Sequence, residues 1–115
     1  MPIDAQKKQN LLDAVTNIRS AELSLKQASQ TTADPGTLTK ISIEFNHLDS
    51  FLSQILHIQA IADDKDFASA TIALKQQAAT LQADENNIKK IVNDVKVSAQ
   101  IVGYIAQAIA LIAKA

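Results

Sequence analysis

The stretch LQADENNIKKIV, residues 81–92, decides how many helices the C-terminal half of this chain forms. It contains Asp84-Glu85-Asn86-Asn87, the one group of residues after position 67 that suggests a turn. Two features predict that a helix continues through this group instead. An apolar seam keeps its 3–4 register across it, and Glu85 precedes Lys89 by four residues, the favourable order for a helical ion pair.

That seam extends in both directions from the quoted stretch. All of its positions except Thr71 and Glu85 are apolar, and they are Phe67, Thr71, Leu74, Ala78, Leu81, Glu85, Ile88, Val92, Val95, Ala99, Val102, Ala106, Ile109 and Ala113. A helix of this length would measure about 70 Å. We therefore predict one long C-terminal helix that overhangs its partners, and the alternative is a four-helix bundle with a turn at 84–87.

The N-terminal part of the chain predicts a first helix from Asp4, which serves as its cap, to Gln30. Its seam consists of Leu11, Val15, Ile18 and Leu25, with Glu22 in the remaining position. The run TTADPGT should end this helix, because Asp34-Pro35-Gly36 is a strong turn sequence.

A second helix is predicted from Thr37, as its cap, to about Ala62. Its seam consists of Ile41, Phe45, Leu48, Leu52 and Ile55, and further apolar residues flank it on both sides. A face this wide indicates contact with two neighbouring helices. Asp66 is the expected cap of the segment that follows.

Composition agrees with a helical protein and narrows its function. The 115 residues are 47% hydrophobic and include only two Gly and two Pro, which is typical of a few long helices. We expect a single all-α domain over residues 1–115, an antiparallel helical bundle with coiled-coil-like seams. The formal net charge of −1 argues against nucleic-acid binding. The first ten residues contain no apolar signal-peptide core, which favours a cytoplasmic protein.

Residues with catalytic or metal-binding chemistry are few. Glu44 and His47 form a Glu-x-x-His pair, which in some bundles belongs to a two-metal carboxylate site, but no second copy of the motif exists. We interpret the pair as a solvated pair on a helix flank, and His57 as a surface histidine. We therefore expect no catalytic residues, no metal and no cofactor, and the protein is not expected to be an enzyme.

The segment 97–113 contains no charged residue. Its polar residues Gln100 and Gln107 lie on one stripe with Lys89, Lys96 and Lys114, and a helix that faces lipid has no reason to keep such a stripe. Packing against protein is therefore favoured over membrane insertion.

Together these features predict a non-enzymatic interaction or assembly protein. It should self-associate, or bind a helical protein partner, through its apolar C-terminal helix. The expected interaction surface consists of Ile101, Val102, Ile105, Ile109 and Ile112. The alternative function is that of a membrane-active helical protein whose segment 97–113 inserts after oligomerisation.

Overall fold

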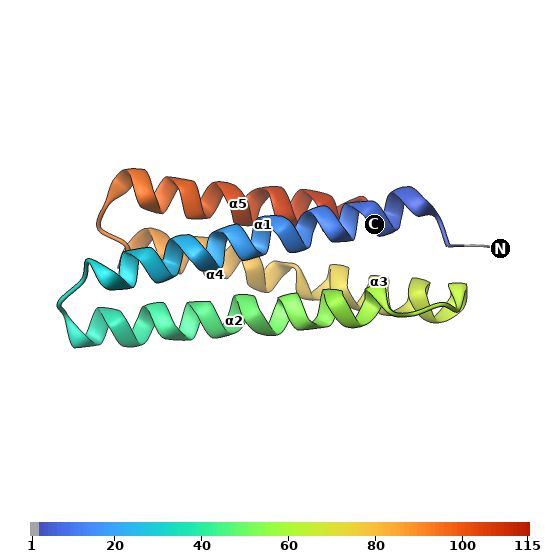
Figure 1. Ribbon diagram of the computed structural model, residues 1–115, viewed down its shortest axis with the longest axis horizontal. Coiled ribbons are helices and arrows are strands. Elements are labelled where there is room, and N and C mark those ends of the chain that lie inside the picture. The colour runs from blue at the N-terminus through green and yellow to red at the C-terminus, as the bar shows by residue number, and fades with distance from the viewer. Residues whose placement is uncertain (1–2) are drawn as a thin grey trace.

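The computed structural model describes residues 3–115, which form five helices (Figure 1). They are α1 (Ala5–Gln30), α2 (Pro35–Gln59), α3 (Asp64–Gln77), α4 (Ala79–Ile91) and α5 (Val95–Ala113). The helices form an elongated up-down-up-down bundle of 52 × 21 × 19 Å. It has four antiparallel segments, and α3 and α4 together form the third of them. α1 packs against α2 and α5, and α4 also packs against α2 and α5. The predicted all-α antiparallel bundle is confirmed.

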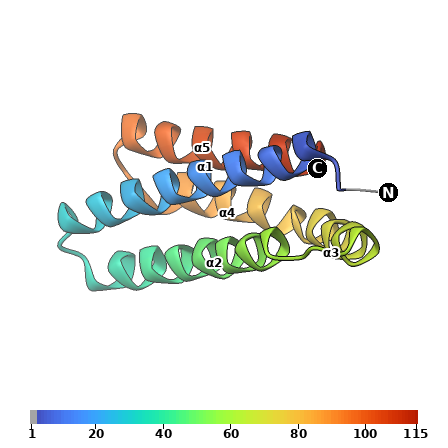
Figure 2. The same cartoon turned by 45° about the vertical axis from the view of Figure 1, so that its right-hand side comes forward.

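The third segment of the bundle is bent where α3 meets α4, at Ala78 (Figure 2). Ala78 keeps helical backbone angles, but its amide donates to the carbonyl three residues back rather than four. The Thr80 hydroxyl donates to the Gln77 carbonyl at 2.7 Å, so this carbonyl at the end of α3 keeps a partner. The bend is thus a local tightening of the helix, and the chain direction is not reversed there.

Four of the helices begin at an aspartate that caps them. Asp4, Asp34, Asp63 and Asp94 precede α1, α2, α3 and α5. Each accepts one or two hydrogen bonds from backbone N–H groups two or three residues later, at 2.8–3.3 Å. The predicted cap Asp4 is confirmed. The predicted caps Thr37 and Asp66 are wrong, because an aspartate three residues earlier takes the position in both cases.

The predicted turn at Asp34-Pro35-Gly36 is also corrected. Asp34 is the cap of α2, and Pro35 is its first residue, where the missing N–H and fixed φ of proline fit a helix start. Gly36 is helical and has no positive φ. The chain therefore reverses over residues 31–34, which overlap the predicted turn only at Asp34.

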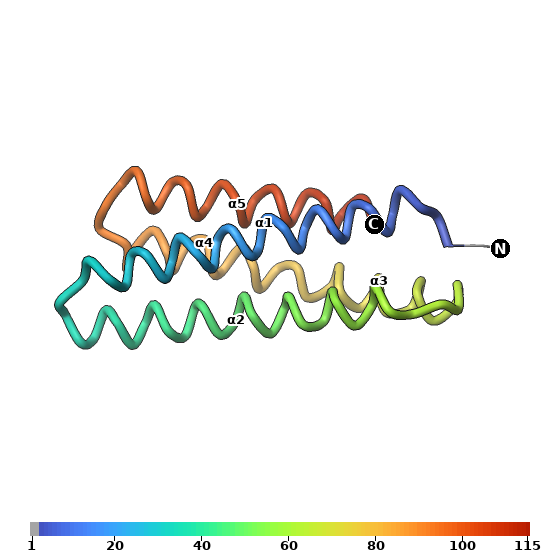
Figure 3. The backbone as a smooth tube through the Cα atoms, in the orientation of Figure 1, coloured from blue at the N-terminus to red at the C-terminus, as the bar shows by residue number. Residues whose placement is uncertain are grey.

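The prediction of one continuous C-terminal helix is wrong. Residues 84–87 are helical, as predicted, but α4 ends at Ile91 and the chain reverses through Val92, Asn93 and Asp94 (Figure 3). Val92 is extended, and Asp94 caps α5. The bundle therefore has four antiparallel segments, as in the alternative prediction, but its last turn lies at 92–94 and not at 84–87. Folding back brings α5 onto α1 and α4, which buries apolar surface that an overhanging helix would leave in water.

The core follows the predicted seams until this reversal and departs from them after it. Side chains with almost no exposure come from every helix: Leu11, Ile18, Leu25, Leu48, Ile55, Leu74, Leu81, Ile88, Ile101, Ile105 and Ile112. Of the predicted α2 seam, only Phe45 is half-buried rather than buried. In α5 the buried face lies one residue earlier than predicted, because the extended residues at the reversal interrupt the helical phase.

Candidate functional site

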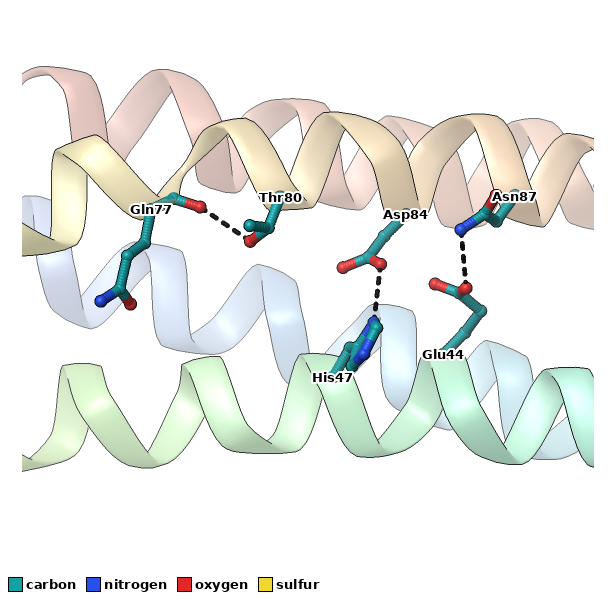
Figure 4. Close-up of polar contacts among 6 residues, drawn as sticks. All are labelled: Glu44, His47, Gln77, Thr80, Asp84 and Asn87. Atoms are coloured by element: carbon teal, nitrogen blue, oxygen red, sulfur yellow. Dashed lines mark hydrogen bonds and ion pairs between the residues drawn. The ribbon is translucent and has the colours of Figure 1, made fainter.

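A polar cluster lies between α2 and α4, where most of the bundle interior is apolar. Glu44 and His47 are one turn apart on α2, and Asp84 and Asn87 are one turn apart on α4. Because the two helices are antiparallel, Glu44 faces Asn87 and His47 faces Asp84 (Figure 4). Asn87 Nδ2 donates to Glu44 Oε1 at 3.0 Å, and His47 Nδ1 lies 3.1 Å from Asp84 Oδ1.

The carboxyl groups of this cluster are inside the protein, and the imidazole is not. Glu44 is 4% exposed and Asp84 is equally buried, whereas 61% of the His47 side chain is exposed. The second carboxylate oxygen of Glu44, Oε2, is buried and has no hydrogen-bond partner. Burial raises the pKa of Glu44 to about 7, and the neighbouring Asp84 adds to this rise, whereas Asn87 and His47 oppose it. Glu44 therefore holds a proton more readily than an exposed glutamate.

The interpretation of the Glu-x-x-His pair as solvated holds for His47 only. Glu44 is corrected to a buried residue, because it faces α4 rather than the flank. His57 is exposed, as predicted. The sequence contains a feature that could have indicated the cluster: Asp84-x-x-Asn87 repeats the three-residue spacing of polar residues on the partner helix. The tertiary pairing of α2 with α4 was needed to see that the two motifs face one another.

A second candidate site is the outward side of α5. This helix has two apolar rows, and its inward row of Ser98, Ile101, Ile105, Ala108 and Ile112 is buried in the bundle. We call the other row the outer seam; it consists of Val95, Ala99, Val102, Ala106, Ile109 and Ala113, spaced alternately four and three residues apart. Val95 is 82% exposed, the three alanines are exposed, and Val102 and Ile109 are only partly buried.

The structure separates the five residues predicted as an interaction surface. Ile101, Ile105 and Ile112 are fully buried within the chain itself, so in this fold they are core residues and not surface residues. Val102 and Ile109 lie on the outer seam, and for them a role in partner contact stays a prediction. The difference follows from the one-residue shift in the helical phase of α5.

An open groove runs between the outer seam and the end of α4. Val92 and Asn93 line one side, and Val95, Ala99, Val102 and Ala106 line the other. Gly103 also lines the groove, and a Cβ atom at this position would meet no atom within 4 Å. Within residues 3–115, packing therefore gives no reason for a glycine there.

No protein-family model matches this sequence, and comparisons with curated proteins and with solved structures found no match either. The fold defines the class, a helical bundle with a buried carboxyl cluster and an uncovered apolar helix face.

Proposed function

We propose that this protein is a non-enzymatic helical assembly protein whose copies associate through the outer seam of α5. The observation that carries the proposal is that α5 has two apolar rows, of which the bundle buries one. The exposed row keeps the four–three spacing with which helices pair in coiled coils. A helix that served only this bundle would need one apolar stripe and could be polar elsewhere.

A second copy of the chain fits this surface better than an arbitrary partner. The outer seam is rich in alanine, and Gly103 with Ala99, Ala106 and Ala110 makes the exposed side of α5 narrow. Two such helices can approach closely along these small residues, with Val102 and Ile109 packing beside them. In a two-fold symmetric dimer the same patch meets itself, so the larger side chains of one copy can pack against the small residues of the other. The polar stripe with Gln100 and Gln107 is exposed and would remain in water.

Gly103 also supports close helix contact. Glycine inside a helix lowers stability relative to alanine by up to about 1 kcal/mol. Since nothing in this chain fills the space beside it, a neighbouring helix from another copy would explain the residue.

The first test is the oligomeric state, measured by sedimentation velocity from low micromolar to millimolar protein. We expect a concentration-dependent dimer or larger oligomer that Val102→Asp disrupts, because the new carboxylate would be buried at the contact. Gln100→Asp makes the same change of charge on the polar stripe of the same helix and should leave association intact. Circular dichroism must show that both variants stay helical. A wild-type protein that remains monomeric at millimolar concentration would contradict the proposal.

Gly103→Ala provides a second test with opposite effects on fold and assembly. The added methyl group meets no atom in the monomer, so monomer stability should rise by up to about 1 kcal/mol. Association should weaken about tenfold or more if helices meet at this position. Thermal unfolding at low concentration and sedimentation at high concentration measure the two effects. A variant that is more stable and associates as well as the wild type would place the interface elsewhere.

Membrane insertion of α5 is the alternative function. Within residues 3–115, α5 is the one helix long and apolar enough to cross a membrane, and 28% of its most apolar window is buried in the bundle. Insertion would require α5 to leave α1, and its polar stripe would then face a water-filled lumen between several copies. Liposome flotation separates the alternatives. Protein that floats with vesicles and gives steady bilayer conductance, with ion selectivity altered by Gln107→Lys, would favour the membrane function.

A further inference from the structure

We propose that Glu44, His47 and Asp84 bind one divalent transition-metal ion between α2 and α4. The three side chains each supply one donor atom, and these atoms lie within 4.8 Å of one another. They come from two helices that already pack together, so the site is formed by the fold and does not depend on assembly.

The distances are close to those that a metal ion requires. Zinc lies about 2.0–2.2 Å from imidazole nitrogen and carboxylate oxygen, so two donors in a tetrahedral site are about 3.4 Å apart. His47 Nδ1 and Asp84 Oδ1 are 3.1 Å apart, near this value. The remaining adjustment falls on the Glu44 side chain, which can approach by rotation about its own torsions.

The unpartnered oxygen of Glu44 is the observation that points to a ligand. Oε2 is buried without a hydrogen bond, and in Figure 4 it points away from Asn87, toward the side on which Asp84 lies. A buried polar atom without a partner is rare and unfavourable in folded proteins. A cation placed between Glu44 and Asp84 would give this oxygen a partner and would balance the negative charge of the carboxyl pair once its proton is released.

The kinds of donor atom indicate the class of ion. Two carboxylates and one imidazole suit Zn²⁺, Fe²⁺, Mn²⁺ or Co²⁺, whereas Ca²⁺ needs six or more oxygen ligands. His47 is largely exposed, so an ion can enter from its side and keep water at the open coordination position. Asn87 donates to the other oxygen of Glu44 and is a positioning residue that orients this carboxylate.

Isothermal titration calorimetry of Zn²⁺ binding to the tag-free protein tests the proposal. We expect one Zn²⁺ per chain with a micromolar dissociation constant, and a melting temperature that rises with Zn²⁺ and returns with EDTA. Glu44→Gln, His47→Ala and Asp84→Asn should each weaken binding about tenfold or more. His57→Ala removes the other histidine of α2 from an exposed position and should bind like the wild type. Co²⁺ should give a visible absorption band in the wild type that His47→Ala loses.

Glu44→Gln separates metal binding from unfolding. It removes a buried carboxylate, so the metal-free variant should stay folded and melt at or above the wild-type temperature, while its response to Zn²⁺ is lost. Absence of saturable binding to the wild type would overturn the proposal and leave a proton as the occupant of the carboxyl pair. If His57→Ala weakened Zn²⁺ binding as much as His47→Ala, the proposal would be overturned as well, because the ion would then bind elsewhere.

Discussion

At the scale of single residues, two buried glutamates distinguish this bundle from a purely apolar one. Glu44 lies between α2 and α4, and Glu22 of α1 lies beside Asp49 of α2. Burial, followed by the nearby Asp49, raises the pKa of Glu22 to about 7, and Arg19 opposes this rise. In the folded state both glutamates therefore keep their proton up to about pH 7, and each has an aspartate next to it.

The first prediction concerns pH. Both folded-state pKa values are about 7, above the ordinary value of 4.5, so the folded chain binds more protons than the unfolded chain between these values. The stabilisation is therefore present at low pH and is lost as pH rises through 7. With EDTA present, the melting temperature should be about 5 °C higher at pH 5 than at pH 8.

A double variant serves as the control for this prediction. Glu22→Gln with Glu44→Gln removes both groups and should flatten the difference between pH 5 and pH 8. Thr37 donates hydrogen bonds to Asp34 and lowers its pKa, so this cap of α2 stays ionised between pH 5 and pH 8 and does not contribute to the difference. A wild-type protein that is more stable at pH 8 than at pH 5 would contradict the assignment.

At the scale of elements, Asp94 caps the start of α5 just after the chain reverses. Its Oδ1 accepts from Lys96 N at 3.0 Å and from Val97 N at 3.1 Å, which gives two N–H groups at the start of α5 a partner. Neither glycine nor proline marks the reversal, and the 3–4 apolar pattern continues through it. The aspartate cap is thus the local feature that marks the start of α5.

The second prediction is that Asp94→Ala lowers the free energy of unfolding by about 1 kcal/mol. Asp94→Asn keeps an oxygen acceptor and should be close to the wild type, because asparagine is an equally good helix cap. Urea unfolding of the three proteins at a concentration where each is monomeric makes the comparison. If alanine were as stable as asparagine at this position, the hydrogen bonds of Asp94 would not stabilise the reversal.

At the scale of the whole molecule, the docking of α5 against α1 decides which of its two apolar rows belongs to the core. The inward row is fully buried, and the outer seam carries Val95, which is 82% exposed. The row predicted as the core from the continuous register is the exposed one. A one-residue change of phase rotates a helix by about 100°, enough to exchange these two faces.

The third prediction tests this exchange. Ile105→Ala should lower the free energy of unfolding by about 2–5 kcal/mol, because it removes buried methyl groups and leaves a cavity. Val95→Ala should change monomer stability by no more than about 0.5 kcal/mol, since its side chain is in water. Chemical denaturation at low protein concentration measures both. Similar losses at the two positions would mean that α5 packs in the register predicted from the sequence.

The sequence alone specifies the helical class, the extent of α1 and α2 within a few residues, their buried seams and the helical state of residues 84–87. These properties follow from local periodicity and local capping, which neighbouring residues in the chain specify. It did not determine the reversal at 92–94, because helical propensity and apolar spacing favour continuation there. What decided the reversal is burial: folding α5 back covers Ile101, Ile105 and Ile112 with side chains from distant parts of the chain. The same packing of α2 against α4 brings Glu44 to Asp84, forty residues further along, and no local pattern contains that contact.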